Sequence, residues 1–376
     1  MWFKMSVAII GDTHFSRKAE NPLLKKHIKR GQKEFFEFLV KDLKKRKIKT
    51  VFFTGDVFDT RNSINVEALI ETKRMFENLM SDFEIHIVCG NHDMYFDDTR
   101  EITSIELLEW MPNITVHRDQ VNCIPINGKD MYIIPWVLPS ERTDFISFLS
   151  AIEPKKNNNI LFGHFDMVGI DMEGGSMSTS GLSPNVFANA ASLTISGHYH
   201  GHSSQVIDGS VINYVGSPYP LTFANAKSEH GYWILHETGS MEFIKNELSP
   251  TFKTIIDTDD LTSITSLENS FVRLYVNNAK TKEEVFYAKS IIESKKPIFL
   301  NIIPYKEEGD ILINNGIPTD INKSANKLLN MDTFSLSEIY IDTNPDQLPK
   351  LTTHADAKLA VLNKVKEYQI QLNLKK

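Results

Sequence analysis

The chain is poor in cysteine, lacks long apolar runs and carries no excess of positive charge, and each shortage excludes a class of protein. Two cysteines among 376 residues cannot form a disulfide framework, so we expect a reducing, cytoplasmic location. The lack of an 18-residue apolar stretch and of a signal-peptide pattern predicts a chain that is not exported and does not span a membrane. A net charge of −7 argues against a protein that coats nucleic acid by electrostatics alone.

The length predicts more than one domain, because a single hydrophobic core seldom exceeds roughly 250 residues. The sequence pattern changes after about Pro250, where a compact β-α-β unit without metal-ligand clusters follows. We therefore expect a main domain at 1–250, a small α+β domain at 251–345, and a linker with a C-terminal helix at 346–376.

The first 90 residues alternate short apolar runs with amphipathic segments, the pattern of a layered α/β domain. Residues 32–47 and 64–80 have helical periodicity. The predicted strands of the main domain are Val7–Ile10, Val51–Thr54, Ile85–Cys89, Met131–Pro135, Ile160–Phe162, Leu193–Ser196, Ser210–Val215 and Gly231–His236.

Polar clusters directly follow five of these strands, at residues 12–14, 55–59, 90–93, 163–164 and 197–200. In open α/β sheets, binding sites gather at this carboxyl edge. The clusters combine carboxylates, imidazoles and one carboxamide, a ligand set that suits Mn²⁺, Fe²⁺ or Zn²⁺. One such cluster is usually an ordinary loop, but five at successive strand ends predict a metal site.

The motif series DxH, GDxxD, GNHD, GH and GHxH at residues 12–200 resembles the calcineurin-like metallophosphoesterase superfamily. The resemblance implies a β-sandwich core flanked by helices and two divalent metal ions, with Mn²⁺ favoured and Mg²⁺, Fe²⁺ or Zn²⁺ as alternatives. It assigns one ion to Asp12, His14 and His200 and the other to Asn91, His164 and His198, with Asp56 between them.

The same resemblance implies roles for three further side chains. His92 contacts the scissile phosphate or protonates the leaving oxygen, and Asp93 orients the ring of His92. Asp59 either supports the metal loop or takes a direct part in catalysis. In the segment GHYHGH, Tyr199 is expected in the packing, and His202 is either an exposed loop residue or a substrate contact.

The segment NYVGSPYPLTFANAKSEHGYWILH at 213–236 is similar to SbcD-like nuclease subunits of double-strand-break repair complexes. This implies a DNA exonuclease and endonuclease that uses two-metal in-line hydrolysis on double-stranded ends, hairpins and single strands. It also implies that the small domain at 251–345 caps the main domain and binds DNA, and it implies a coiled-coil, SMC-like ATPase partner and a homodimer. Two alternatives stay open: a stand-alone phosphodiesterase for small nucleotides, and a subunit that binds DNA ends without cutting.

Residues 25–49 hold eleven basic and three acidic side chains, a local charge of +8. Such a run is either a solvated helix face or a phosphate-binding surface. The first group lies nearer the expected metal site, so we predict DNA contacts for Lys25, Lys26, Lys29, Arg30 and Lys33. The stripe Leu359, Leu362 and Val365 either packs within the chain or docks on the ATPase.

Overall fold

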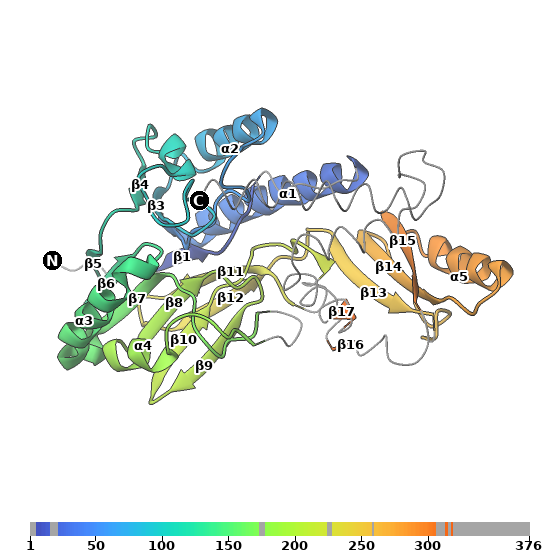
Figure 1. Ribbon diagram of the computed structural model, residues 1–376. Helices are drawn as coiled ribbons and strands as arrows, with labels where there is room; N and C mark the ends of the chain where they lie inside the picture. Colours follow the sequence, from blue (N-terminus) through green and yellow to red (C-terminus); the bar gives the residue numbers. More distant parts are fainter. Residues whose placement is uncertain are drawn as a thin grey trace, which may run out of the picture. The chain divides into compact units, whose positions relative to one another are not determined.

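The computed structural model describes residues 5–15, 22–172, 177–223, 228–257 and 259–305, together with the short paired strands β16 (Ile313–Asn314) and β17 (Ile317–Pro318) (Figure 1). The chain divides into two compact units, Met1–Tyr305 and Lys306–Lys376. The linker and helix predicted at 346–376 lie outside the described residues, and the domain boundary at residue 250 stays a prediction.

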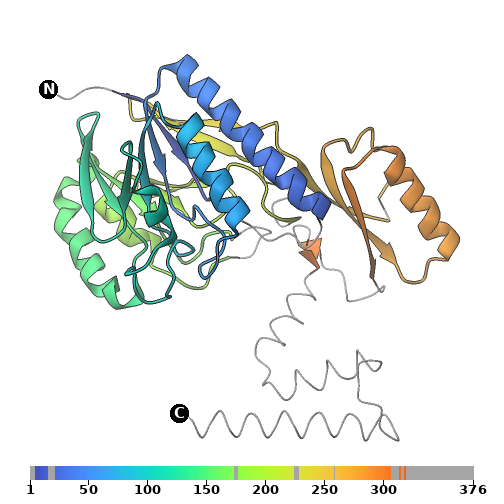
Figure 2. The same cartoon turned by 90° about the horizontal axis from the view of Figure 1, so that it is seen from above.

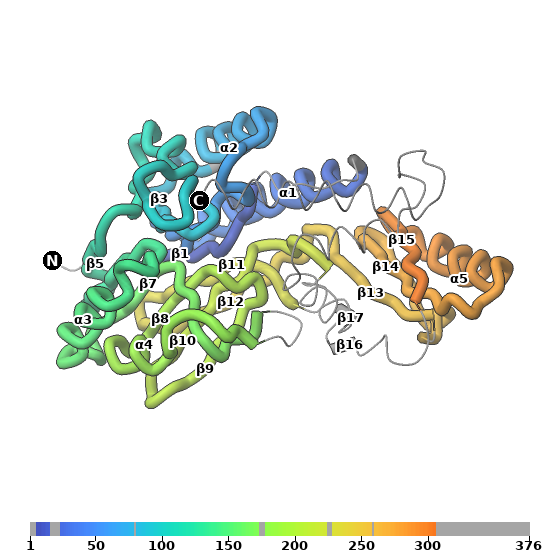
Figure 3. The backbone as a smooth tube through the Cα atoms, viewed as in Figure 1, coloured from blue at the N-terminus to red at the C-terminus, as the bar shows by residue number. Residues whose placement is uncertain are grey.

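The first sheet has six strands around a parallel centre. β1 lies between β2 and β11. β11 is antiparallel to β1, and β12 at the edge is antiparallel to β11. Figure 3 shows β1 and β11 side by side although more than 200 residues separate them. The strands in spatial order are β12 (Met241–Lys245), β11 (Gly231–Leu235), β1 (Val7–Ile10), β2 (Thr50–Phe53), β3 (Glu84–Val88) and β4 (Ile114–His117).

The second sheet also has six strands, with four parallel strands between two antiparallel edges. Its order is β5 (Asn122–Ile126), β6 (Lys129–Ile134), β7 (Asn159–His164), β8 (Leu193–Gly197), β10 (Ser210–Tyr214) and β9 (Ser203–Ile207).

Both faces of each sheet are buried, because the strands alternate between two apolar layers. Val7 and Ile9 of β1 pack with Phe162 of β7 between the sheets. Ala8 and Ile10 point the other way, toward the outer helices. The predicted layered α/β sandwich with flanking helices is confirmed.

Helices cover the outer face of each sheet (Figures 1 and 2). α1 (Pro22–Arg46) and α2 (Val66–Leu79) cover the first sheet, and Phe35, Phe36 and Leu39 of α1 are fully buried there. α3 (Arg142–Ile152) and α4 (Pro184–Ala190) cover the second, with the 3₁₀ turns η1 (Ser104–Leu108), η2 (Pro139–Glu141) and η3 (Glu153–Asn158) in the connections. Among the described helices, none has the length and apolar character that a bilayer crossing requires.

A small parallel sheet follows the sandwich and matches the predicted β-α-β unit. It consists of β13 (Thr251–Ile256), β14 (Ser270–Asn277) and β15 (Phe299–Tyr305), with α5 (Lys282–Ser294) packed on one face. The N-terminal half of α1 touches it, since Arg30 donates a hydrogen bond to Asn269 Oδ1 at 2.9 Å.

Helix α1 begins ten residues earlier than the predicted helix at 32–47. Its first turns carry many lysines and one glycine, which hide the apolar periodicity. Gly31 has a structural reason, because a Cβ there would lie 2.8 Å from Pro250 Cδ. The helix accepts a residue that costs about 1 kcal/mol relative to alanine, and the chain leading into β13 packs directly on it.

Two histidines are buried in the first sheet. His86 Nδ1 and His117 Nε2 lie 3.0 Å apart, and the His86 ring stacks on Phe52. Burial, and then the neighbouring His86, lowers the pKa of His117 to about 4. Since the folded state favours the neutral ring, this stability is fully present above the unfolded pKa of about 6.5 and is lost as the pH falls toward 4.

We predict that His117→Gln makes the fold less sensitive to acid. Between pH 7 and pH 5 the wild type should lose about 2 kcal/mol more unfolding free energy than the variant. Urea unfolding at both pH values, with chelator present so that metal binding does not contribute, measures the difference. Parallel losses in the two proteins would contradict a neutral buried pair.

Candidate metal centre

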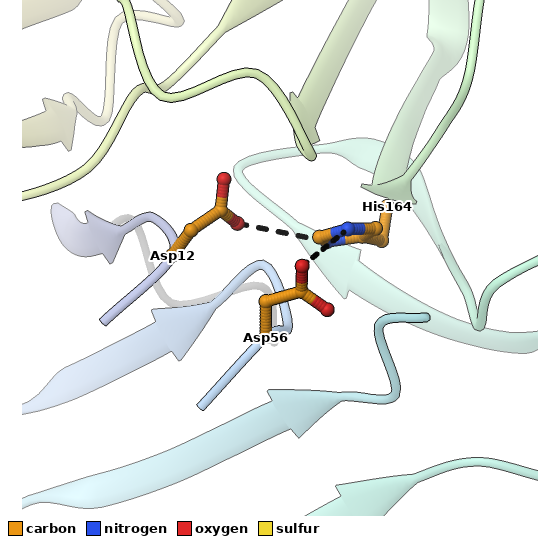
Figure 4. A group of neighbouring side chains, drawn as sticks. All are labelled: Asp12, Asp56 and His164. Carbon is orange, nitrogen blue, oxygen red and sulfur yellow. Dashed lines mark ion pairs between the residues drawn. The ribbon is translucent and has the colours of Figure 1, made fainter. Parts of the chain in front are cut away.

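The predicted ligand residues come from the carboxyl ends of strands in both sheets. Those of the first sheet follow β1, β2 and β3, and those of the second sheet end or follow β7 and β8. Figure 4 shows the side chains of Asp12, Asp56 and His164 pointing toward one another. One potential ligand atom from each of these three lies within 4.8 Å of the others.

Asn91, His164 and His198 form one group of potential ligands. The Oδ1 atom of Asn91 lies 3.0 Å from His164 Nε2 and 3.1 Å from His198 Nδ1. His164 donates from Nδ1 to the carbonyl of Thr54 at 2.9 Å, which directs Nε2 into the group. These are the three residues that the resemblance assigns to one ion.

His14 and His200 form the second group, with their Nε2 atoms 3.0 Å apart. Asp56 lies between the groups, because its Oδ2 atom is 3.3 Å from His164 Nε2 and 3.7 Å from His14 Nε2. A carboxylate in this position suits two cations, since it offsets their mutual repulsion. The division into two metal sites stays a prediction that this geometry supports.

Asp12 is fully buried, and its described contacts are to the group around His164. The backbone N–H of His198 donates to Asp12 Oδ2 at 2.9 Å, and Oδ1 lies 3.6 Å from His164 Nδ1. Oδ1 has no hydrogen-bond donor among the described residues. A buried carboxylate oxygen without a donor is costly, and a cation would satisfy it.

The electrostatics also call for positive charge. Burial raises the pKa of Asp12 to about 8. Burial opposes ionisation of Asp56 too, but His164 and His14 outweigh it and hold the pKa of Asp56 well below its usual range. Burial alone would lower the pKa of His164, yet the charge of Asp56 raises it to about 9. A proton on His164 thus partly serves the need that metal ions would meet, so the residues fit divalent cations.

Three predicted ligands have left-handed backbone conformations, which non-glycine residues rarely adopt. The φ angles are +42° at His14, +51° at Asp56 and +94° at His198. Such conformations cost on the order of 1–3 kcal/mol each and concentrate at functional sites. The loops are therefore held in shapes that aim side chains rather than in their most stable local shapes.

The role predicted for Asp93 needs correction. Its carboxylate accepts hydrogen bonds from the backbone N–H groups of Gly90 (2.9 Å), Asp56 (2.8 Å) and Val57 (2.9 Å). His92 instead donates from Nδ1 to the carbonyl of Asp59 at 2.8 Å. Asp93 therefore fixes the loop that carries Asp56, and it does not orient the ring of His92.

Asp59 contacts two histidines of the centre, His92 and His14. Its carbonyl accepts from His92, and its Oδ1 atom lies 3.4 Å from His14 Nδ1. Of the two roles left open by the sequence, these contacts favour support of the metal loop. The backbone N–H of His92 also donates to Asp56 Oδ1 at 2.8 Å, which places this half-buried histidine beside the centre.

The remaining residues of GHYHGH differ in outcome. Tyr199 is buried, as predicted, and its hydroxyl donates to Asp166 Oδ1 at 2.9 Å. His202 is half-buried rather than exposed, and its ring lies 4.4 Å from Phe243 and 5.8 Å from Trp233. The two aromatic side chains come from β11 and β12, whose proximity the short motif did not reveal.

Trp136 lies at the centre but was not predicted there. Its ring centroid is 5.1 Å from that of His198 and 5.8 Å from that of His164. The signal that could have found it is its position, because it follows β6 as the other site residues follow their strands.

The predicted DNA-binding side chains lie along the N-terminal half of α1. Lys25 and Lys29 form ion pairs with Glu67 of α2, at 3.1 Å and 2.7 Å. Arg30 binds Asn269, Lys33 lies 3.9 Å from Glu37, and Lys26 is exposed. Arg30 also lies 3.6 Å from Glu34, so four of the five charges are partly offset.

A two-sheet sandwich with histidine, aspartate and asparagine at its strand ends defines a metal-dependent phosphoesterase. The chain belongs to the calcineurin-like phosphoesterase family, whose model matches residues 5–202.

Two relatives indicate which kind of phosphoesterase the chain resembles. Exonuclease subunit 1 of Enterobacteria phage T4 is 26% identical over 269 residues, 69% of this chain and 75% of that protein. The DNA double-strand break repair protein Mre11 of Sulfolobus acidocaldarius is 23% identical over 319 residues, 80% of this chain and 78% of that protein. The predicted resemblance to SbcD-like nuclease subunits is thereby confirmed. A solved dimetal phosphatase from Danio rerio aligns with a TM-score of 0.40 and 12% identity over 62% of this chain and 92% of that chain.

We predict that Asp93→Asn lowers Mn²⁺ affinity by about 10- to 100-fold, because an amide nitrogen would face backbone N–H donors and loosen the Asp56 loop. His92→Gln should leave that affinity within about threefold. Isothermal titration of both variants with Mn²⁺ makes the comparison. If Asp93→Asn binds Mn²⁺ like the wild type, the loop-fixing role is wrong.

Proposed function

We propose that this chain is a metal-dependent nuclease that hydrolyses phosphodiester bonds of DNA, as an exonuclease and endonuclease at ends formed in recombination and repair. The observation that carries the proposal is the pair of ligand groups that converge on Asp56 Oδ2. Membership of a phosphoesterase family and relatives named as an exonuclease subunit and a break-repair protein support it.

The residues that would hold two divalent ions are Asp12, His14, Asp56, Asn91, His164, His198 and His200. The resemblance favours Mn²⁺, with Mg²⁺, Fe²⁺ or Zn²⁺ as alternatives. Carboxylate, carboxamide and imidazole ligands suit Mn²⁺, Fe²⁺ and Zn²⁺ better than Mg²⁺. Bound ions would supply the Lewis acidity that offsets charge on a phosphate in an in-line displacement.

His92 is the proposed proton donor to the leaving oxygen. Because its Nδ1–H donates to the carbonyl of Asp59, the ring presents Nε2 to the other side. The His92 and His14 rings lie 5.0 Å apart, so this nitrogen belongs to the edge of the centre. In the protonated ring Nε2 carries a transferable proton, and the hydrogen bond from Nδ1 limits the ring's rotation.

The proposed DNA surface is a cavity between α1 and α2, with a volume of about 890 Å³. Its described lining includes five basic residues, Lys25, Lys29, Arg30, Lys33 and Arg74, and two acidic ones, Glu37 and Glu71. Two further acidic residues, Glu67 and Glu34, pair with basic residues of the lining, so basic residues exceed acidic ones by one. Phe15 and Thr60 also line it, and they directly follow His14 and Asp59. A phosphate backbone leaving the metal centre would thus meet positive charge in a chain whose net charge is −7.

We predict that Lys33→Glu and Arg74→Glu each raise KM for single-stranded DNA several-fold and reduce the salt slope of binding by about one phosphate contact. The matched control is Lys44→Glu, at the other end of α1, where Lys44 pairs with Asp82. Initial rates at several NaCl concentrations give both quantities. An equal effect in the control would show that net charge, not this cavity, is responsible.

Partners and location are further proposals. The resemblance implies a coiled-coil ATPase subunit, a homodimer and a cytoplasmic location, and a relative named as an exonuclease subunit supports a partner chain. On α2, Val66 is 70% exposed and Ile70 is 42% exposed, and Lys73 lies over the exposed ring of Trp110. This apolar surface is where we place the dimer contact. Light scattering of the chain alone tests the homodimer. Light scattering after addition of the ATPase subunit tests that partner.

Cleavage of DNA is the central prediction. Purified chain with Mn²⁺ should cut linear and hairpin DNA, with and without the ATPase, at least about 100-fold faster than His92→Ala. Asp56→Ala should be inactive because both ligand groups lose their shared carboxylate. If wild type and variants cut DNA equally, the nuclease proposal fails. Hydrolysis confined to small nucleotide diesters would instead indicate a stand-alone phosphodiesterase.

A further inference from the structure

Two residues outside the ligand set, Trp136 and Arg142, lie beside the metal centre. Together with His164 they line a small cleft, and the other residues that line it are Val137, Phe165, Asp166, Leu182 and Phe187. This cleft lies next to His164, whereas His92 lies next to His14. His92 therefore lies at one side of the metal centre, and Trp136 lies at the other.

Hydrogen bonds fix the backbone of Trp136. Its backbone N–H donates to the carbonyl of Cys89 at 2.8 Å, and its backbone carbonyl accepts from Arg100 Nη1 at 2.6 Å. Arg100 in turn makes two contacts with Glu141, at 2.8 Å and 2.5 Å. The half-buried ring contacts His164 and His198, so it provides an aromatic surface beside the predicted ligands.

Arg142 is placed where a cation is unfavourable for the fold. It is the first residue of α3, and the positive end of a helix dipole disfavours a positive side chain. The adjacent carboxylate of Glu141 is already bound by Arg100. Within the described part of the chain, Arg142 forms no ion pair, and its side chain is half-buried. An anionic ligand would supply the missing partner.

We propose that Trp136 and Arg142 form a nucleotide subsite, in which the indole stacks on an unpaired base and the guanidinium binds the phosphate next to the scissile one. The subsite rests on the proposed nuclease function and deepens it. Aromatic rings and arginine are the side chains that bind single-stranded nucleic acid without regard to sequence. The subsite thus favours frayed ends and single strands over a closed duplex.

The test separates the aromatic face from simple packing. Trp136→Leu keeps an apolar side chain without a π face, and Trp136→Phe keeps a smaller one. With Mn²⁺-loaded full chain, the leucine variant should raise KM for a single-stranded thymidine 12-mer about tenfold, and the phenylalanine variant less than threefold. For methyl 4-nitrophenyl phosphate, which has no base, the change in KM caused by the leucine variant should be several-fold smaller than its change for the 12-mer.

Arg142→Gln should raise KM for the 12-mer several-fold and lower its salt dependence by about one phosphate, while Lys44→Gln changes neither. The subsite is overturned if the leucine variant matches wild type on DNA. It is also overturned if the variant loses activity on both substrates to the same degree, because Trp136 would then only support the histidines. Wild type that hydrolyses the small diester but not DNA would overturn the nuclease proposal itself, and the subsite with it.

Discussion

Buried negative charge is the constraint on which the centre of this protein depends. Asp12, Asp56 and Asp93 are each no more than 1% exposed, and such carboxylates require compensation nearby. Asp93 obtains it from backbone N–H groups, and Asp56 obtains it from histidines. Asp12 is only partly satisfied. The folded chain thus has a site that divalent cations complete, and the geometry of the surrounding loops serves that purpose.

The close approach of two sheets makes such a concentration of charge feasible. Loops from both sheets meet where glycine leaves room for side chains of the centre. A Cβ on Gly90 would lie 2.3 Å from Asp56 Oδ1, and one on Gly197 would lie 2.5 Å from Asp12 Oδ1. Any side chain at these two positions would displace a carboxylate. The glycines of the motifs are therefore steric requirements of the centre as well as turn residues.

The sequence was informative wherever a side chain's role follows from its place after a buried strand. The layered fold and the meeting of the polar clusters at one edge were predictable for that reason, because short apolar runs identify the strands and the sheet brings their ends together. The assignment of these side chains as ligands came from the resemblance and stays a prediction. The role of Asp93 was not, because it depends on backbone donors from a loop 35 or more residues away. The surroundings of His202 and the start of α1 depend in the same way on strands and loops that arrive about 30 to 220 residues later in the chain.

The pairing of β1 with β11 sets an order for assembly during synthesis. All seven predicted ligands are made by residue 200, but β11 begins only at Gly231. Until then β1, which leads directly to Asp12, has an open edge on one side. An unpaired strand edge is unstable and prone to wrong pairing. A nascent chain that already contains every predicted ligand therefore still lacks the strand that completes the sheet beside Asp12.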